Sequence, residues 1–230
     1  MQEKKPLRLV VLDFDGTLGD TQQLILSTMQ KTIAYLHLPS RTNEQCKKMI
    51  GLPLKQTFTG MIAMSDEMGD RCADVYRKIF EEDNGPGAVP VFPHVLETIK
   101  ALKKDGLTLT IASSRASLSL MQFIHDMHLD DDISLVLSCD DITHPKPHPE
   151  AVDKTLQLTG FTPEETIVVG DAPYDILMGL NAGCRTVAVS YGNGSIDELK
   201  AAGADFIIDD FADLLRIVRS ENPKSPESPE

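Results

Sequence analysis

The feature that most constrains the fold is an alternation of short apolar runs with helical segments, regular from about residue 95 onward. Runs that are apolar throughout, rather than at every second residue, are typical of strands buried on both faces of a sheet. Strands that alternate with helices in this way pair in parallel, with helices on both sides. The pattern predicts an α/β fold with a doubly wound parallel sheet. Strands are expected at 9–12, 107–112, 133–137, 166–169, 185–189 and 205–208, and helices at 95–104, 118–127, 149–158, 174–181 and 195–202, with a last helix ending near residue 219.

Residues 20–83 have a different character, because their apolar residues recur at helical spacing and no stretch alternates like a strand. The segment that follows, DNGPGAVPVFP at 83–93, is dense in glycine and proline and reads as a linker. We therefore expect a small all-helical domain inserted into the α/β domain. The expected bounds are 1–19 and 90–220 for the core, 20–89 for the helical insert, and 221–230 for a disordered tail of low complexity.

Composition excludes several classes of protein. The net charge of −13 argues against a nucleic acid or an anionic membrane surface as partner. No apolar run approaches the roughly 20 residues of a membrane span, and no signal peptide precedes the first strand, so a cytoplasmic location is expected. The four cysteines lack metal-binding spacing and are expected to be reduced.

Two acids end the first apolar run, in the sequence LVVLDFDGT. Asp13 and Asp15 are two residues apart, so in extended chain both carboxylates face the same side, about 6–7 Å from each other. A helix N-cap would explain one acid at a turn from strand to helix. It does not explain two on one face, and we therefore interpret the pair as part of a site.

Polar side chains also follow two later strands. In an open parallel sheet, ligands bind beyond the carboxyl ends of the strands, so residues at those ends meet at one edge. The residues expected there are Asp13, Asp15, Ser113, Ser114, Asp171 and Asp175.

Several carboxylates gathered at one edge would repel each other by about 1–4 kcal/mol per close pair. A hard divalent cation with oxygen ligands resolves this repulsion, and Mg²⁺ suits such a donor set. The charges of Asp13, Asp171 and Asp175 would be balanced by Mg²⁺ and one lysine. Lys146, held between two prolines in HPKPHPE, is the candidate, although a solvated surface lysine is the commoner case.

The motifs DFDGT at 13–17, Ser113, Lys146 in KPHPE and GDAPYD at 170–175 resemble the four motifs of the haloacid dehalogenase-like hydrolase superfamily. The resemblance spans the chain from about residue 9 to 218, with the motifs in the same order. It is greatest for the branch of phosphoglycolate phosphatases and β-phosphoglucomutases. That branch implies a Rossmann-like core with a helical cap domain between the first two motifs, where residues 20–89 stand here.

The resemblance implies a role for each motif residue. Asp13 would be the nucleophile that forms an aspartyl-phosphate, and Asp15 the general acid and then base. The implied Mg²⁺ ligands are the carboxylates of Asp13 and Asp171 and the backbone carbonyl of Asp15, with Asp175 holding a metal-bound water or orienting Lys146. Phosphate binding falls to Ser113, to the backbone at Ser114, and to Lys146. Thr17 would position Asp15.

Other candidates have less support. Arg115 could reach the substrate, or lie at the surface. Lys55 loosely resembles a substrate-reading position of the cap. His144 and His148, with Asp140 and Asp141, could suggest a second metal site, but the prolines between the histidines are expected to separate them.

Four functions compete within this framework. A dehalogenase would not need Asp15, Asp171 and Asp175. A β-phosphoglucomutase-like mutase would carry a histidine where this chain has Ile25. A catalytically silent binding module is disfavoured, because none of the four motifs is broken.

The expected function is therefore a Mg²⁺-dependent phosphatase for a small phosphorylated metabolite, a phosphoric monoester hydrolase. Phosphoglycolate is the first candidate, followed by a sugar phosphate, a nucleoside monophosphate and inorganic pyrophosphate. We expect a monomer or a weak homodimer.

Overall fold

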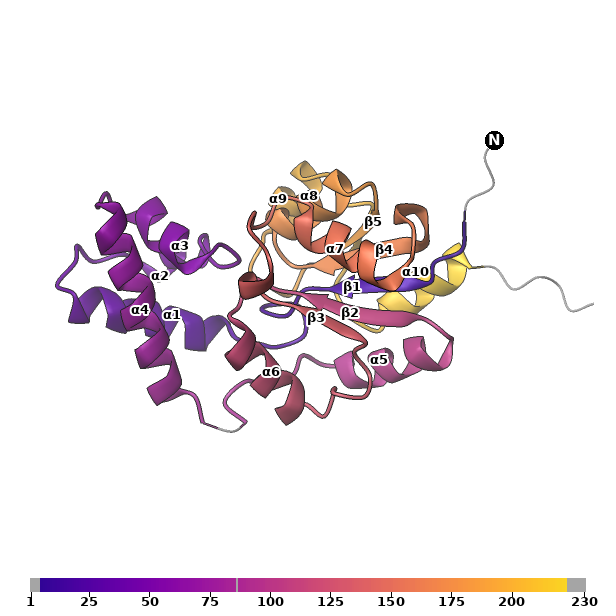
Figure 1. Ribbon diagram of the computed structural model, residues 1–230, viewed down its shortest axis with the longest axis horizontal. Coiled ribbons are helices and arrows are strands. Elements are labelled where there is room, and N and C mark those ends of the chain that lie inside the picture. The colour runs from indigo at the N-terminus through magenta and orange to yellow at the C-terminus, as the bar shows by residue number, and fades with distance from the viewer. Residues whose placement is uncertain (1–4, 86, 223–230) are drawn as a thin grey trace, which may run out of the picture.

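The centre of the molecule is a six-stranded sheet in which every neighbouring pair of strands is parallel. The computed structural model describes residues 5–85 and 87–222 (Figure 1). The strand order β3-β2-β1-β4-β5-β6 shows a chain that winds outward on one side of β1 and then on the other. This order confirms the predicted doubly wound, Rossmann-like fold. The strands are β1 (Leu9–Leu12), β2 (Thr108–Ala112), β3 (Leu135–Leu137), β4 (Thr166–Gly170), β5 (Arg185–Val189) and β6 (Phe206–Ile208).

Both faces of the sheet are covered, which explains why its strands are apolar at every position. In β1, Val10 and Leu12 pack into one cluster, and Leu9 and Val11 into another on the opposite face. All four side chains are fully buried. The first face is covered by α5 (Val95–Lys104), α6 (Ser117–Asp126) and α10 (Asp213–Glu221), and the second by α7 (Glu150–Thr159), α8 (Pro173–Asn181) and α9 (Ile196–Ala201).

Several expected elements differ by one or two residues from those observed. β3 begins at Leu135 rather than at residue 133, because the Ile133 N–H bonds to the Leu129 carbonyl in the preceding turn. β6 begins at Phe206, one residue later than expected. β2 likewise begins at Thr108, one residue later than expected, so the structure shortens three of the predicted strands without changing their order.

Four helices between β1 and α5 pack against one another beside the core (Figure 1). An aromatic contact joins two of them, because the ring centroids of Phe58 and Tyr76 lie 6.2 Å apart. Within its own helix Tyr76 also stacks on Phe80, with centroids 5.9 Å apart. We propose that this layer is the cap domain, with the bounds expected from the sequence. The helices are α1 (Gln22–Tyr35), α2 (Asn43–Lys47), α3 (Leu54–Met61) and α4 (Asp66–Asp83).

The two chain segments that join the helical layer to the core run side by side. The Asp20 N–H donates to the Pro90 carbonyl at 2.8 Å, and the Phe92 N–H donates to the Leu18 carbonyl at 3.0 Å. Both connecting segments therefore leave the core at the same place, next to the end of β1. The helical layer consequently lies over the edge of the sheet where Asp13 and Asp15 are found (Figure 1).

The carboxyl-terminal segment begins in an ordered state, contrary to the expectation for residues 221–230. α10 ends at Glu221, and the Asn222 side chain donates to the Leu7 carbonyl at 2.7 Å and accepts from the Leu7 N–H at 2.5 Å. Residues 223–230 lie outside the described part of the chain. Within that part, no helix is both long and apolar enough to cross a membrane.

Candidate active site

Three adjacent strands bring the motif residues to one edge of the sheet. Asp13 follows β1, Ser113 follows β2 and Asp171 follows β4, and these strands lie in the order β2-β1-β4. Asp175 joins them from the first turn of α8, where its Oδ2 accepts from the Ala172 N–H at 3.0 Å. The strand order thus gathers residues from three separate motifs, as the rule for parallel sheets predicts.

Lys146 lies at the centre of this group and is 4% exposed. Its Nζ donates to Asp13 Oδ1 and to Asp175 Oδ1, both at 2.6 Å. Burial alone would lower the pKa of Lys146, but the charges and hydrogen bonds of the two carboxylates outweigh it and raise that pKa. Lys146 is therefore a buried ammonium group, and the alternative of a solvated surface lysine is wrong.

The carboxylates of Asp13, Asp171 and Asp175 offer oxygen atoms within 4.8 Å of one another. All three residues are buried. Burial, together with the charges of the other two acids, raises the pKa of Asp13 well above its ordinary value, although Lys146 opposes the shift. Burial and the charge of Asp175 raise the pKa of Asp171 to about 7. Three buried carboxylates beside one ammonium group leave a surplus of negative charge, and their oxygens suit a hard divalent cation.

Asp171 is held by a residue that the sequence analysis did not identify. Its Oδ2 accepts from the Asn193 backbone N–H at 2.6 Å and from Asn193 Nδ2 at 2.8 Å. Asn193 lies in the loop YGNG after β5, which ends at the same edge of the sheet. The rule that was applied to the other strand ends would have pointed to this loop.

Gly16 has no side chain, and the Asp171 carboxylate occupies the space that a side chain would fill. The φ of Gly16 is +90°, and a Cβ at this position would lie 2.1 Å from Asp171 Oδ2 and 2.4 Å from Asn193 Nδ2. Glycine is needed here both for its backbone conformation and for this close approach. Thr17, the next residue, does not position Asp15 as expected: its hydroxyl lies 3.4 Å from Asp13 Oδ2, to which it donates.

Asp15 is paired with Arg115 rather than with Lys146. Arg115 Nε donates to Asp15 Oδ2 at 3.0 Å, and its Nη2 donates to Asp15 Oδ1 at 2.5 Å. The guanidinium carbon of Arg115 lies 4.7 Å from the ring centroid of Phe80 in α4 and 4.9 Å from that of Phe123 in α6. The Arg115 side chain is only 7% exposed, so the alternative of a surface role for it is wrong.

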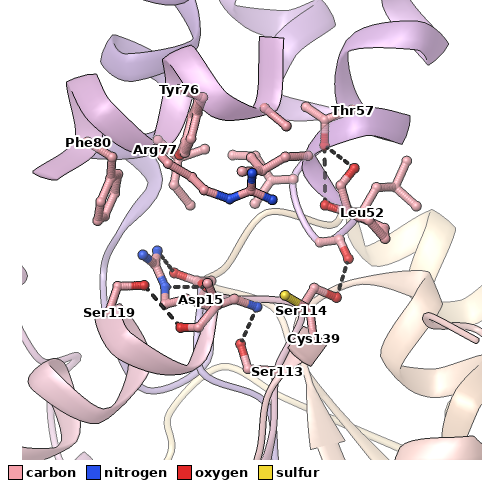
Figure 2. A pocket seen from close by; sticks show the side chains of 18 of the residues that line it. Asp15, Leu52, Thr57, Tyr76, Arg77, Phe80, Ser113, Ser114, Ser119 and Cys139 are labelled. Carbon is pink, nitrogen blue, oxygen red and sulfur yellow. Dashed lines mark hydrogen bonds and ion pairs between the residues drawn. The ribbon is translucent and has the colours of Figure 1, made fainter. Parts of the chain in front are cut away.

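The two serines after β2 make different contacts. Ser113 is 3% exposed, and its Oγ accepts from the Arg115 N–H at 3.2 Å. The Ser114 hydroxyl instead donates to the carbonyl of Gly51, between α2 and α3, at 2.8 Å (Figure 2). Since the Ser114 side chain is used in this contact, its expected part in phosphate binding rests on its backbone.

The remaining candidates lie farther from the acids. Lys55 lines the cavity from α3, where its Nζ lies 3.3 Å from Asp66 Oδ2 and 3.1 Å from Asp70 Oδ2. His144 and His148 are not separated by the intervening prolines as expected, because their rings stack with centroids 4.5 Å apart. Asp140 and Asp141 bind the backbone N–H groups of Ser117 and Ser138, respectively.

A cavity of about 400 Å³ separates the acids from the helical layer. Asp13, Asp15, Asp171 and Asp175 line its core side, and residues of α1, α3 and α4 line the opposite side. Figure 2 shows Tyr76, Arg77 and Phe80 of α4 facing Asp15 and Ser113 across this space. The site is therefore a cleft between the core and the helical layer, with a charged floor.

Comparison with known proteins agrees with this geometry. The family model described as haloacid dehalogenase-like hydrolase matches residues 10–189. Pyrophosphatase PpaX of Oceanobacillus iheyensis is 34% identical over 214 residues, 92% of this chain and 97% of that protein. A predicted phosphatase from Clostridium acetobutylicum has the same fold, with a TM-score of 0.85 and 22% identity, over 94% of this chain and 100% of that one. A predicted phosphoglycolate phosphatase from Haemophilus somnus 129PT also has this fold, with a TM-score of 0.81 and 23% identity, over 94% of this chain and 99% of that one.

The chain therefore belongs to the haloacid dehalogenase-like hydrolase family, as the four motifs indicated. Family membership and the names of these relatives confirm the expected enzyme class, a hydrolase of the phosphatase type.

Replacing Gly16 by alanine should destabilise the protein more than the same change at Gly106. Both glycines have φ near +90°, but nothing lies within 4 Å of a Cβ at Gly106. We expect Gly106→Ala to cost about 1–2 kcal/mol of unfolding free energy for its backbone conformation alone. Gly16→Ala should cost more and should also abolish stabilisation by Mg²⁺, as measured by urea denaturation with and without the metal. Equal losses in the two variants would contradict the packing of Gly16 against Asp171.

The stability of the metal-free protein should fall as pH rises toward neutrality. The pKa of Asp171 rises from 3.8 to about 7 on folding, so between these values the folded chain holds a proton that the unfolded chain has released. The stabilisation is thus present at low pH and lost as pH rises through 7. Because a divalent cation needs the ionised form, Mg²⁺ should raise Tm more at pH 8 than at pH 5. Asp171→Asn should remove most of this difference, whereas equal Tm shifts in the wild type would contradict it.

Proposed function

We propose that this protein is a Mg²⁺-dependent phosphatase that hydrolyses a small phosphorylated metabolite through an aspartyl-phosphate on Asp13. The observation that carries the proposal is the pairing of a buried Asp13 carboxylate with Lys146, beside a second acid, Asp15, at the floor of a covered cavity. A nucleophile, a cation for the phosphoryl oxygens and a proton donor are thereby gathered in one place.

The residues present fit the metal that the family implies. Asp13, Asp171 and Asp175 supply buried carboxylate oxygens, and their surplus negative charge has a single ammonium group to balance it among the described residues that touch them. These carboxylates, with the backbone carbonyl of Asp15, would hold the ion. When bound, Mg²⁺ would neutralise charge on the phosphoryl oxygens and bring them toward Asp13.

The steps assigned to the chain's own residues follow from their positions. The Asp13 carboxylate attacks phosphorus as the bond to the leaving oxygen breaks, and Asp15 gives that oxygen a proton. Asp15 then takes a proton from the water that attacks the aspartyl-phosphate, and phosphate is released with Asp13 restored. Lys146 and Ser113 stabilise the transferring oxygens. Arg115 fixes the orientation of the Asp15 carboxylate through two hydrogen bonds. The carboxylate oxygens have further lone pairs, so Asp15 can still take part in these proton transfers.

The cavity wall supports hydrolysis over the mutase alternative. Ile25, at the position where the mutase resemblance would require a histidine, is 9% exposed and lines the cavity. An isoleucine cannot exchange protons with a bound sugar phosphate. The function proposed for the site is therefore transfer of the phosphoryl group to water.

Two compounds serve as reference substrates. Phosphoglycolate is the first candidate from the sequence resemblance, and it also figures in the name of one protein of the same fold. Inorganic pyrophosphate is favoured by the name of the relatives that share 34% identity with the chain.

Asp13→Asn should abolish Mg²⁺-dependent release of p-nitrophenol from p-nitrophenyl phosphate. Asparagine keeps the shape of the side chain but is not a nucleophile, so kcat should fall by at least about 10³-fold. Asp126→Asn, an exposed acid at the end of α6, should leave kcat unchanged. EDTA should also abolish turnover in the wild type. Retained turnover in Asp13→Asn would overturn the nucleophile assignment, and activity in EDTA would overturn the metal assignment.

Asp15→Asn should separate formation of the aspartyl-phosphate from its hydrolysis. p-Nitrophenolate leaves without a proton, so one equivalent should be released in a burst, while hydrolysis slows by about 10²–10⁴-fold for want of the base. Rapid quenching should then recover phosphate bound to the protein. With an alkyl phosphate, which needs a protonated leaving group, the burst itself should disappear. Unchanged steady-state rates in this variant would contradict the acid–base role of Asp15.

A further inference from the structure

The upper wall of the cavity contains a continuous group of apolar side chains, although Lys55, Asp70, Asp74, Arg77 and Glu81 also line it. The apolar group is formed by Ile25 and Met29 of α1, by Leu52 and Leu54 around the start of α3, and by Tyr76 and Phe80 of α4. Figure 2 shows Leu52, Tyr76 and Phe80 on the cap side of the space, facing the polar residues of the core. A group that leaves the phosphorus and extends toward the cap therefore meets hydrocarbon.

The arginine and lysine that the cap presents to this cavity already have acidic partners. Lys55 lies between Asp66 and Asp70, and Arg77 donates to Asp74 at 2.9 Å. On the core side Arg115 is bound by Asp15 in the same way. Every lysine or arginine among the described residues that line the cavity thus has a carboxylate partner.

The charge of the described cavity lining is strongly negative. A bound Mg²⁺ and Lys146 offset the phosphoryl group and the acids around it, but they leave the cap side unchanged. A second anionic group on the substrate would therefore approach additional carboxylates, and the lysine and arginine beside them are already paired with acids. The cations that line the cavity are Lys55, Arg77 and Arg115. They are outnumbered by the carboxylates that line it, which are Asp13, Asp15, Asp70, Asp74, Glu81, Asp171 and Asp175.

The size of the cavity also favours a substrate larger than phosphoglycolate or pyrophosphate. At about 400 Å³ it lies in the range of roughly 300–1,000 Å³ that is typical of pockets for drug-sized ligands. Phosphoglycolate and pyrophosphate are much smaller than such ligands, and each carries charge at the end that would face the cap. They would leave most of the apolar wall uncovered.

We propose that the substrate is a phosphate monoester with an uncharged, mainly apolar leaving group that is larger than glycolate or phosphate. This inference rests on the proposed phosphatase function and narrows its substrate class. In the reaction, the phosphorus–oxygen bond of the ester breaks and Asp15 supplies the proton of the released alcohol. Water then gives its oxygen to the phosphate and its proton to Asp15, so that ester and water yield alcohol and phosphate.

A homologous series tests the proposal in the wild-type enzyme with Mg²⁺. The probes are n-alkyl phosphates from ethyl to hexyl, 1-naphthyl phosphate, phosphoglycolate and inorganic pyrophosphate. If the apolar wall binds the leaving group, kcat/KM should rise by up to about fourfold per methylene. Hexyl and 1-naphthyl phosphate should exceed phosphoglycolate and pyrophosphate by at least about tenfold in kcat/KM, the gain of two buried methylenes. A flat or falling series, or a preference for either small anion, would overturn the proposal.

A cavity-filling variant provides a second test. Ala73 of α4 is 4% exposed and lines the cavity next to Tyr76 in the same helix. Ala73→Leu should lower the ratio of kcat/KM for hexyl phosphate to that for ethyl phosphate by about tenfold, through lost space for the longer chain. Ala63→Leu, an exposed alanine of the cap outside the cavity, should keep the wild-type ratio. An unchanged ratio in a folded Ala73→Leu protein would count against the assigned wall.

The same panel distinguishes failure of this inference from failure of the proposed function. If Mg²⁺-dependent hydrolysis of p-nitrophenyl phosphate is observed but the small anions are the best substrates, the phosphatase assignment stands and the apolar leaving group is wrong. If no phosphate ester or anhydride in the panel is hydrolysed, the proposed function itself fails.

Discussion

The contact of one buried ammonium group with two carboxylates is the interaction on which the site depends. Lys146 Nζ lies 2.6 Å from both Asp13 and Asp175, and all three side chains are less than a tenth exposed. Removal of one partner from a buried ion pair typically costs about 3–5 kcal/mol, because the other charge stays buried without compensation. The contact also joins the loop before α7 to the end of β1 and the start of α8, so it positions three segments that are distant in the sequence.

The two acids of the DFDGT motif lie in different electrostatic surroundings, although only one residue separates them. Asp13 shares its site with Asp171, Asp175 and Lys146, whereas Asp15 is bound by Arg115, whose guanidinium group lies against the rings of Phe80 and Phe123. Different surroundings are how paired carboxylates come to serve different chemical steps. Phe80 belongs to α4 of the helical layer and Phe123 to α6 of the core, so the surroundings of Asp15 depend on how these two parts pack.

The cavity joins two surfaces with opposite properties. Its floor has the charge and oxygen ligands that a metal ion and a phosphoryl group need, and its cap side is mainly apolar with each cation neutralised by an acid. The floor is built from motif residues at the strand ends, and the cap side from helices α1, α3 and α4. The residues proposed for the chemistry and those proposed to contact the leaving group therefore come from different parts of the chain.

The amino-acid sequence by itself determined the sheet and the helical insert, because apolar periodicity and strand-end positions follow local rules. Its four motifs indicated the family and the candidate acids and lysine of the site. The contact of Asp175 with Lys146 was one of the alternatives expected from the family resemblance, but other side-chain partnerships were decided by tertiary structure alone. The pairing of Arg115 with Asp15, the hold of Asn193 on Asp171 and the contact of Ser114 with the cap join residues that are 22 to 100 positions apart in the chain. Which donor meets which carboxylate depends on packing distances of a few ångströms, and periodicity carries no information on that scale.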